Sequence, residues 1–158
     1  MAVTVEILPP IRVAYVHHVG PMSEIADAFS TLMEWAALAG VDVEDEQVLV
    51  VSHDDPATSR PDEQRYDAAI TVQQDVEATS QIAITTIGDR EYVVGDYAGP
   101  YAGIADAYRS ARRDASDMRI TLDDGPNLEF LVDVPQSPDD IDAVIYLPMK
   151  IMTENPEQ

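Results

Sequence analysis

A ten-residue segment of this chain occurs twice. Residues 20–29 (GPMSEIADAF) and residues 99–108 (GPYAGIADAY) are identical at six of ten positions and lie 79 positions apart. The same offset aligns Pro56 with Pro135, so the match continues beyond the first segment without a gap. The offset is half of the 158 residues. The sequence therefore predicts a tandem duplication, and the fold has to be one that two similar units build together.

Both halves of the chain contain the same series of predicted elements. Apolar residues recur every three or four positions over residues 23–39, which predicts a helix that Ser23 caps and Gly40 ends. A similar stripe predicts a second helix from Ile104 to Ala115. Segments rich in β-branched and aromatic residues predict strands at residues 3–8, 12–19, 48–53 and 66–72 in the half 1–79, and at residues 81–87, 92–97, 128–133 and 143–147 in the half 80–158.

The number of helices limits the fold class. Two units with one main helix each cannot cover both faces of a long sheet. We therefore expect a single α+β domain over residues 1–158, with a mainly antiparallel sheet, both helices on one side and a pseudo-twofold axis between the halves. The polar, proline-interrupted segment 54–64 is predicted to be a loop, and residues 153–158 a loose tail.

The composition excludes several classes of function. The chain has 9 basic and 30 acidic residues, a net charge of −21 and a pI of about 4.1, which argues against direct binding of nucleic acid or of an anionic membrane. The one basic patch, Arg109, Arg112 and Arg113, lies among aspartates that we expect to neutralise it. The excess of aspartate and arginine fits either a salt-rich cytoplasm or a GC-rich coding bias.

The chain contains no cysteine, so it has no disulfide, no thiolate metal site and no cysteine nucleophile. No segment approaches the roughly 20 apolar residues of a membrane-spanning helix. The first residues lack the basic and apolar pattern of a secretory signal, and we therefore expect a cytoplasmic location.

Glu129 is the first candidate site residue. Along the predicted strand 128–133, alternate residues share a face, which places Leu128 and Phe130 on one side and Glu129 and Leu131 on the other. The repeat aligns Val50 with Glu129, so a charge breaks the duplication here. Glu129 either faces solvent or lies in an apolar cleft. In a cleft, desolvation would disfavour the carboxylate, and a bound cation would favour it.

Aromatic residues are further candidates, since rings with a hydroxyl group can wall a pocket for a flat or cationic ligand. The candidates lie beside the two Gly-Pro turns or on the strands after the helices, and they are Tyr66, Tyr97, Tyr101, Tyr146 and His18. Packing in the core is the alternative for each of them. Packing is the interpretation that we favour for Tyr108 and Trp35, which lie on the predicted helices.

The sequence predicts neither a metal site nor a cofactor. Neighbouring His17 and His18 on a strand point to opposite faces, and His53 has no further ligand at a diagnostic spacing. There is no Gly-rich phosphate loop and no G-x-S-x-G turn. Three pairs of aspartates, at 54–55, 123–124 and 139–140, lie in predicted loops, where solvated acids are common.

The order of several segments resembles the GyrI-like family, an effector-binding domain that also forms the C-terminus of many AraC-type and MerR-type regulators. The matching segments are residues 8–16, 18–21, 29–35, 54–56, 65–70, 99–101 and 128–130. The resemblance implies a duplicated β-α-β-β fold with a ligand cleft between the halves and Glu129 in the cleft. Leu131 stands where the family commonly has a tyrosine. The chain has no room for the helix-turn-helix of the regulators, so it resembles their sensor half alone.

Three functions remain open at this stage. The first is a stand-alone protein that binds a small lipophilic molecule, cationic or neutral, and senses or sequesters it. The second is a hydrolase of electrophilic, cyclopropane-bearing toxins, in which Glu129 activates water and Tyr97 or Tyr146 replaces the absent family tyrosine. The third is an interaction protein whose acidic surface mimics DNA and modulates a partner such as DNA gyrase or another regulator.

Overall fold

The structure, a computed structural model, describes residues 2–135, 137 and 139–150, so the predicted tail 153–158 lies outside the described residues. The elements of the first half are β1 (Thr4–Leu8), β2 (Ile11–Val19), α1 (Ile25–Ala39), β3 (Val48–Ser52) and β4 (Arg65–Thr71). Those of the second half are β5 (Ala83–Ile87), β6 (Arg90–Gly99), α2 (Ile104–Asp117), β7 (Asn127–Leu131) and β8 (Ile141–Pro148). Short 3-10 turns lie at η1 (Met22–Glu24), η2 (Val43–Asp45), η3 (Pro61–Glu63) and η4 (Tyr101–Gly103).

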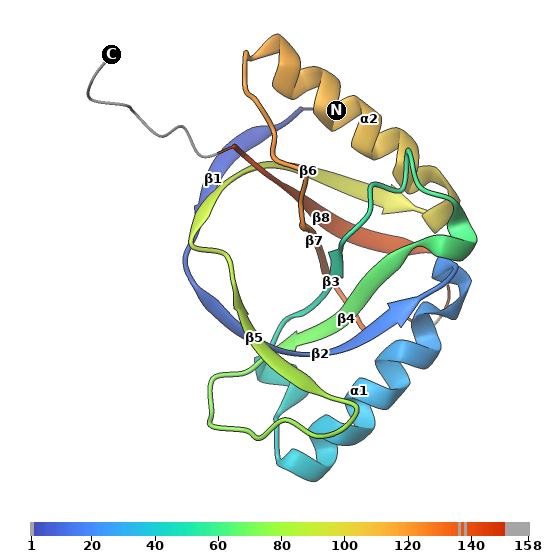
Figure 1. The fold of residues 1–158 in the computed structure, drawn as a ribbon, viewed down its shortest axis with the longest axis vertical. Coiled ribbons are helices and arrows are strands. Elements are labelled where there is room, and N and C mark those ends of the chain that lie inside the picture. Colours follow the sequence, from blue (N-terminus) through green and yellow to red (C-terminus); the bar gives the residue numbers. More distant parts are fainter. Residues whose placement is uncertain (1, 136, 138, 151–158) are drawn as a thin grey trace.

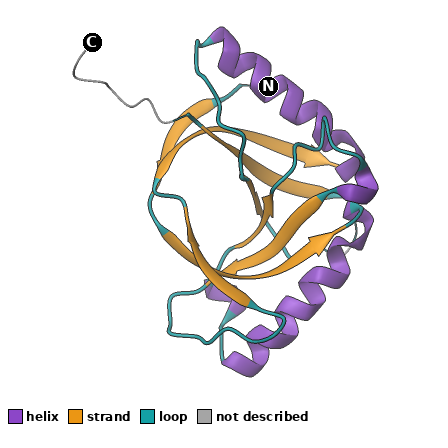
Figure 2. Cartoon of the chain, viewed as in Figure 1, coloured by secondary structure: helices purple, strands orange, loops and turns teal. Residues whose placement is uncertain are grey.

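The eight strands form one antiparallel sheet in the order β1-β6-β8-β7-β3-β4-β2-β5. The sheet curls strongly, and both helices lie on the same side of it, outside the curl (Figure 1). Figure 2 shows the same separation of strands from helices. The predicted α+β class, with antiparallel strands and one main helix in each half, is confirmed.

The two halves meet at the pairing of β3 with β7. Val50 on β3 lies directly opposite Glu129 on β7, and the repeat offset relates the same two residues. A pseudo-twofold axis therefore passes between them. The offset also maps β1 onto β5 and β3 onto β7 residue by residue, so the duplication seen in the sequence is a duplication of structure.

The first strand of each half belongs to the other half of the sheet. β1 pairs with β6, and β5 pairs with β2. This exchange places β1 and β5 at the two edges of the sheet. Each half therefore supplies an edge strand to the strands of the other half, and the eight strands form one sheet across both halves.

The start of α1 differs from the prediction, and its end does not. Ser23 lies in the turn η1, and the residue before α1 is Glu24, which makes no side-chain cap. The predicted cap was wrong because the chain leaves the extended Pro21 through a 3-10 turn before it becomes helical. Gly40 ends the helix in the left-handed conformation with φ 75°, as predicted.

The two faces of the sheet carry separate apolar clusters. The helix face, which packs against α1 and α2, includes Phe29, Leu32, Val50, Ile70, Tyr108 and Ile145. The opposite face, here called the far face, includes Val13, Leu49, Ala69, Tyr92, Leu128 and partly buried Phe130. The predicted separation of Leu128 from Glu129 follows from this alternation. Among the described residues, no helix has the length and apolar character needed to cross a membrane.

Candidate functional site

Glu129 lies in the middle of the helix face and is only 1% exposed. Its neighbours across the sheet are Val50 on β3 and Ile145 on β8. Both carboxyl oxygens accept hydrogen bonds from phenols: Tyr101 Oη donates to Oε1 at 2.7 Å, and Tyr108 Oη donates to Oε2 at 2.6 Å. The carboxyl group of Glu129 is thus fully enclosed at the junction of the two halves.

Burial dominates the electrostatics of this group. Desolvation raises the pKa of Glu129 above its ordinary value, and the hydrogen bonds from the two tyrosines only partly offset this rise. Burial and the neighbouring carboxylate raise the pKa values of Tyr101 and Tyr108 well above the ordinary phenol range, so both stay protonated donors. Among the described residues, no basic side chain forms an ion pair with Glu129. The carboxylate form therefore carries an uncompensated buried charge.

Tyr66 adds a third phenol to the helix face. It lies on β4, is fully buried, and its hydroxyl has no hydrogen-bond partner among the described residues. Burial raises the pKa of Tyr66. The ring of His18 lies 5.2 Å from the ring of Tyr66, and His18 Nε2 is 2.8 Å from a carboxyl oxygen of Glu24. Tyr66 and His18 therefore lie on the same face as Glu129, as the strand register requires.

The polar group around Glu129 replaces an apolar group in the first half. By the repeat offset, the counterparts of Tyr101, Tyr108 and Glu129 are Met22, Phe29 and Val50. In the first half, Phe29 and Val50 are fully buried. The same backbone scheme thus packs well without any of the three polar groups, which indicates that the polar residues of the second half serve something other than folding.

Tyr108 packs in the core, as its helical position predicts, and it also contacts Glu129. Tyr108 is fully buried, as expected, but its hydroxyl is one of the two donors to Glu129. The sequence contained a sign of this contact, because the two repeats differ at both positions: Phe29 corresponds to Tyr108, and Val50 corresponds to Glu129. Trp35 packs against the helix-face core, partly buried.

The two other candidate tyrosines lie on opposite faces of the sheet, Tyr97 on the helix face with Glu129 and Tyr146 on the far face. Tyr97 donates its hydroxyl hydrogen bond to the carbonyl oxygen of Pro100. Tyr146 lies on the far face opposite Leu128, because it alternates with residues that face the helices. Its ring packs edge-on against Tyr92 and Phe130, with centroids 5.6 and 5.1 Å away. A ligand-binding role for Tyr146 stays a prediction and belongs to a different face of the sheet.

The paired aspartates at 54–55 bind arginines and do not form a site of their own. Asp54 holds Arg65 through two side-chain hydrogen bonds, and Asp55 accepts one of 2.7 Å from Arg112 on α2. Arg109 pairs with Asp106, as expected for neighbours on a helix. Arg112 instead pairs with the loop of the first half, because the curled sheet brings that loop beside α2.

Tyr108→Phe is expected to destabilise the protein, and Tyr66→Phe is not. The first substitution removes a donor to a buried carboxyl group, at a cost of about 1–3 kcal/mol. The second removes a buried hydroxyl that has no partner among the described residues, so its effect should be close to zero or stabilising. Urea unfolding at pH 7 measures both. Equal losses for the two variants would contradict this account of the site.

Glu129→Gln is expected to change the pH dependence of stability. The pKa of Glu129 is raised in the folded state, so the folded state favours the protonated carboxyl group. The stability that Glu129 contributes is therefore fully present below the pKa of the unfolded state, and it is lost as pH rises through the pKa of the folded state. Glutamine does not ionise. The melting temperature of the variant should therefore rise relative to the wild type between pH 5 and pH 8, whereas exposed Glu34→Gln should give a constant difference. A constant difference for Glu129→Gln would disprove the raised pKa.

Comparison with known proteins gives both a family and a set of similar folds. The model of the GyrI-like small molecule binding domain matches residues 1–150. The SPbeta prophage-derived protein YosT of Bacillus subtilis (strain 168), whose name proposes a role in transcriptional regulation, is 27% identical over 96 residues, covering 60% of this chain and 64% of YosT. The match spans 58% of the EcmrR chain seen in a DNA complex and 64% of YosT, which is less than two thirds of either protein.

Three solved structures share the fold at low identity. The C-terminal domain of EcmrR superposes with a TM-score of 0.72 at 14% identity, covering 96% of this chain and 98% of that domain. A hydrolase from Listeria innocua superposes with a TM-score of 0.65 at 9% identity, covering 94% of this chain and 91% of the hydrolase. SAV2435 bound to tetraphenylphosphonium superposes with a TM-score of 0.61 at 12% identity, covering 95% of this chain and 94% of SAV2435. These similarities establish the fold alone. Together with the match over residues 1–150, the duplicated antiparallel sheet shows that the chain belongs to the GyrI-like small molecule binding domain family.

Proposed function

We propose that this protein binds a small lipophilic cation at Glu129 and thereby senses or sequesters it. The observation that carries the proposal is a buried carboxyl group with no basic partner among the described residues. A cation whose charge is spread over apolar groups loses little hydration when it is buried, and it would compensate the charge of Glu129. A strongly hydrated cation gains less from the same site.

The surroundings of Glu129 suit such a ligand. Tyr101, Tyr108 and Tyr66 are buried aromatic residues on the same face as Glu129, and aromatic rings attract cations. The hydroxyl of Tyr66 is free of a partner within the described part of the chain. Membership of a small molecule binding family supports the proposal. The fold shared with SAV2435, which is seen bound to the lipophilic cation tetraphenylphosphonium, supports the ligand class.

Ligand entry requires a local movement, because Glu129 is closed off from solvent in this conformation. The turn η4 carries Tyr101, one of the two donors that cover the carboxyl group. It follows Gly99 and Pro100 and ends at Gly103, and α2 begins after it without a side-chain cap. We infer that η4 and the first turn of α2 move aside, so that a ligand takes the place of Tyr101 beside Glu129 and the cleft between the halves opens.

Tetraphenylphosphonium is expected to raise the melting temperature of the protein, whereas tetraphenylborate, an anion of the same shape, is not. The two probes separate charge from lipophilicity. Glu129→Gln should abolish the shift and weaken binding by more than about tenfold, the effect of a change of about 1.4 kcal/mol. Calorimetric titration provides the affinities.

Glu34→Gln is the matched control, because it removes one charge from the same acidic chain at an exposed position. This variant should bind tetraphenylphosphonium as the wild type does. Equal responses to the two probes, or full affinity in Glu129→Gln, would disprove the role that we assign to the carboxyl group.

A hydrolase is the second candidate, favoured by the direct contact of Glu129 with two protonated phenols. In this reaction, the oxygen of a water molecule bonds to an electrophilic cyclopropane carbon, and Glu129 takes the proton from water. The electron pair of the ring bond that breaks moves onto the conjugated carbonyl oxygen of the substrate, which then takes up that proton from Glu129. Tyr101 or Tyr108 would donate a hydrogen bond to the leaving side. Tyr101 and Tyr108 suit this role better than Tyr97, whose hydroxyl is hydrogen-bonded to the carbonyl oxygen of Pro100, or Tyr146, which lies on the far face.

Turnover separates this candidate from binding alone. Hydrolysis predicts that a cyclopropane-bearing alkylating agent incubated in ¹⁸O-labelled water yields a labelled ring-opened product, detected by mass spectrometry. Glu129→Gln should abolish the product while the variant stays folded. Formation of product at the rate seen in buffer alone would leave binding as the function of the site.

A further inference from the structure

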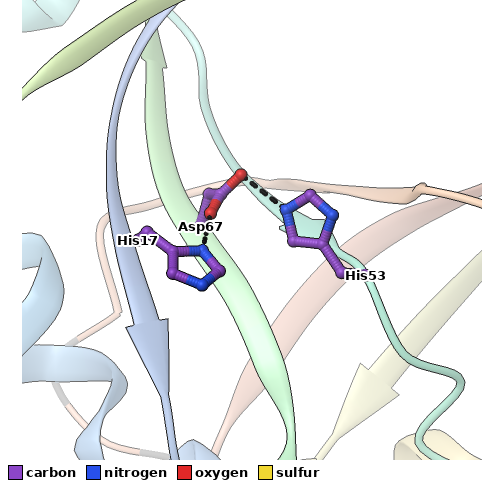
Figure 3. A group of neighbouring side chains, drawn as sticks. All are labelled: His17, His53 and Asp67. Atoms are coloured by element: carbon purple, nitrogen blue, oxygen red, sulfur yellow. Dashed lines mark hydrogen bonds and ion pairs between the residues drawn. The ribbon is translucent and has the colours of Figure 1, made fainter.

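Two histidines and an aspartate converge on the far face of the sheet, on the side opposite to Glu129. They are His17 on β2, Asp67 on β4 and His53, which directly follows β3. One ligand atom from each residue lies within 4.8 Å of the other two. Figure 3 shows both imidazole rings directed at the carboxylate of Asp67. None of these residues takes part in the site around Glu129.

The sheet itself positions the three side chains. His17 and Asp67 are directly opposite each other in the β2–β4 ladder. The backbone N–H of His53 donates to the carbonyl oxygen of Arg65 at 3.0 Å, which extends the β3–β4 pairing by one residue. Three adjacent strands therefore each contribute one side chain to the same face. Such a group needs little rearrangement to bind a ligand, because the strands hold the backbone of each residue.

The distances are those of hydrogen bonds. His17 Nδ1 lies 2.6 Å from Oδ1 of Asp67, and His53 Nε2 lies 2.7 Å from Oδ2. An ionised carboxylate only accepts hydrogen bonds, so each ring nitrogen is the N–H donor of its hydrogen bond to Asp67. A zinc-like ion binds imidazole nitrogen and carboxylate oxygen at about 2.0–2.2 Å, and tetrahedral ligands then lie roughly 3.3 Å apart. Each ring nitrogen therefore needs to move less than about 1 Å away from Asp67 to admit an ion, and the two ring nitrogens already lie within 4.8 Å of each other.

The copy of this region in the second half has no such group. The repeat offset maps His17 onto Asp96 and His53 onto Val132. Val144 is the counterpart of Asp67 by strand pairing, because it lies opposite Asp96 as Asp67 lies opposite His17. The second half completes the same strands with valines at two of the three positions. Folding of the unit therefore does not require two histidines around a buried aspartate, and another role has to account for them.

We propose that His17, His53 and Asp67 form a binding site for a divalent transition metal ion of the zinc class. Two imidazoles and one carboxylate are the donors that such ions prefer. When the ion binds, each coordinating ring nitrogen loses its proton to water and the other ring nitrogen takes up a proton from water, so each imidazole stays neutral and the number of bound protons does not change.

The site has an open side and a suitable charge. A cavity of about 330 Å³ adjoins the group and is lined by Tyr15 and Arg65 in addition to the three ligands. Three protein ligands with an adjoining cavity leave a position for water or a small ligand, as in zinc sites with an open coordination position. Arg65 is the nearby cation, and Asp54 balances its charge through hydrogen bonds of 2.8 and 3.1 Å.

Cobalt(II) is the probe for this site, because its visible absorption bands report the number and type of its ligands. The full chain, first treated with a chelator, is titrated with cobalt chloride and then with zinc chloride. We expect one equivalent of cobalt to bind with the spectrum of a nitrogen- and oxygen-ligated ion and to be displaced by one equivalent of zinc. Excess magnesium should not displace it, although magnesium would compete for general attraction to a chain of charge −21.

His17→Gln, His53→Gln and Asp67→Asn should each weaken cobalt binding by more than about tenfold, since loss of an outer partner alone costs about 10- to 100-fold in metal sites. His53→Gln changes a half-buried position and so keeps the test valid if Asp67→Asn does not fold. His18→Gln is the matched control. It also removes one histidine, but His18 lies on the helix face and not on the far face that carries the three proposed ligands. Absence of one-equivalent binding, displacement by magnesium, or an equal loss in His18→Gln would overturn the proposal.

Discussion

The antiparallel pairing of β3 with β7 joins the two halves, and the position of both polar groups follows from it. Val50 and Glu129 pair across the pseudo-twofold axis, so the two repeats become one sheet and not two. The exchange of β1 and β5 adds two further pairings between the halves. In a continuous sheet, side-chain alternation assigns every residue to one face. Glu129 is thereby directed toward the helices, and Asp67 is directed away from them.

Duplication followed by change explains how one small domain contains two polar groups, each around a buried carboxyl group. The second half has Glu129, Tyr101 and Tyr108 where the first half has only apolar residues, and the first half has Asp67 with two histidines where valines stand at two of the three matching positions in the second. A buried carboxyl group costs free energy unless it is compensated. Each half therefore serves as the internal reference for the other, since it shows the same unit folding without the costly group.

The parts of this account that were predictable rest on local pattern. The order of strands and helices, the end of α1 at Gly40 and the separation of Glu129 from Leu128 follow from periodicity and alternation. The parts that were not predictable depend on contacts between distant segments. The phenol of Tyr108 shares its helical position with Phe29, so packing was the reasonable prediction, and the hydrogen bond to Glu129 appears only when α2 lies on β7.

By itself, the sequence determined the duplication, the α+β class and the place where a charge breaks the repeat, because these are properties of residue order and spacing. Only the tertiary structure decided which side chains meet. It placed Tyr101 and Tyr108 on the two oxygens of one carboxyl group, and it brought His17, His53 and Asp67 together from three strands. The physical reason is that the strand order β7-β3-β4-β2 arises from backbone pairing between segments far apart in the chain, which no local pattern specifies.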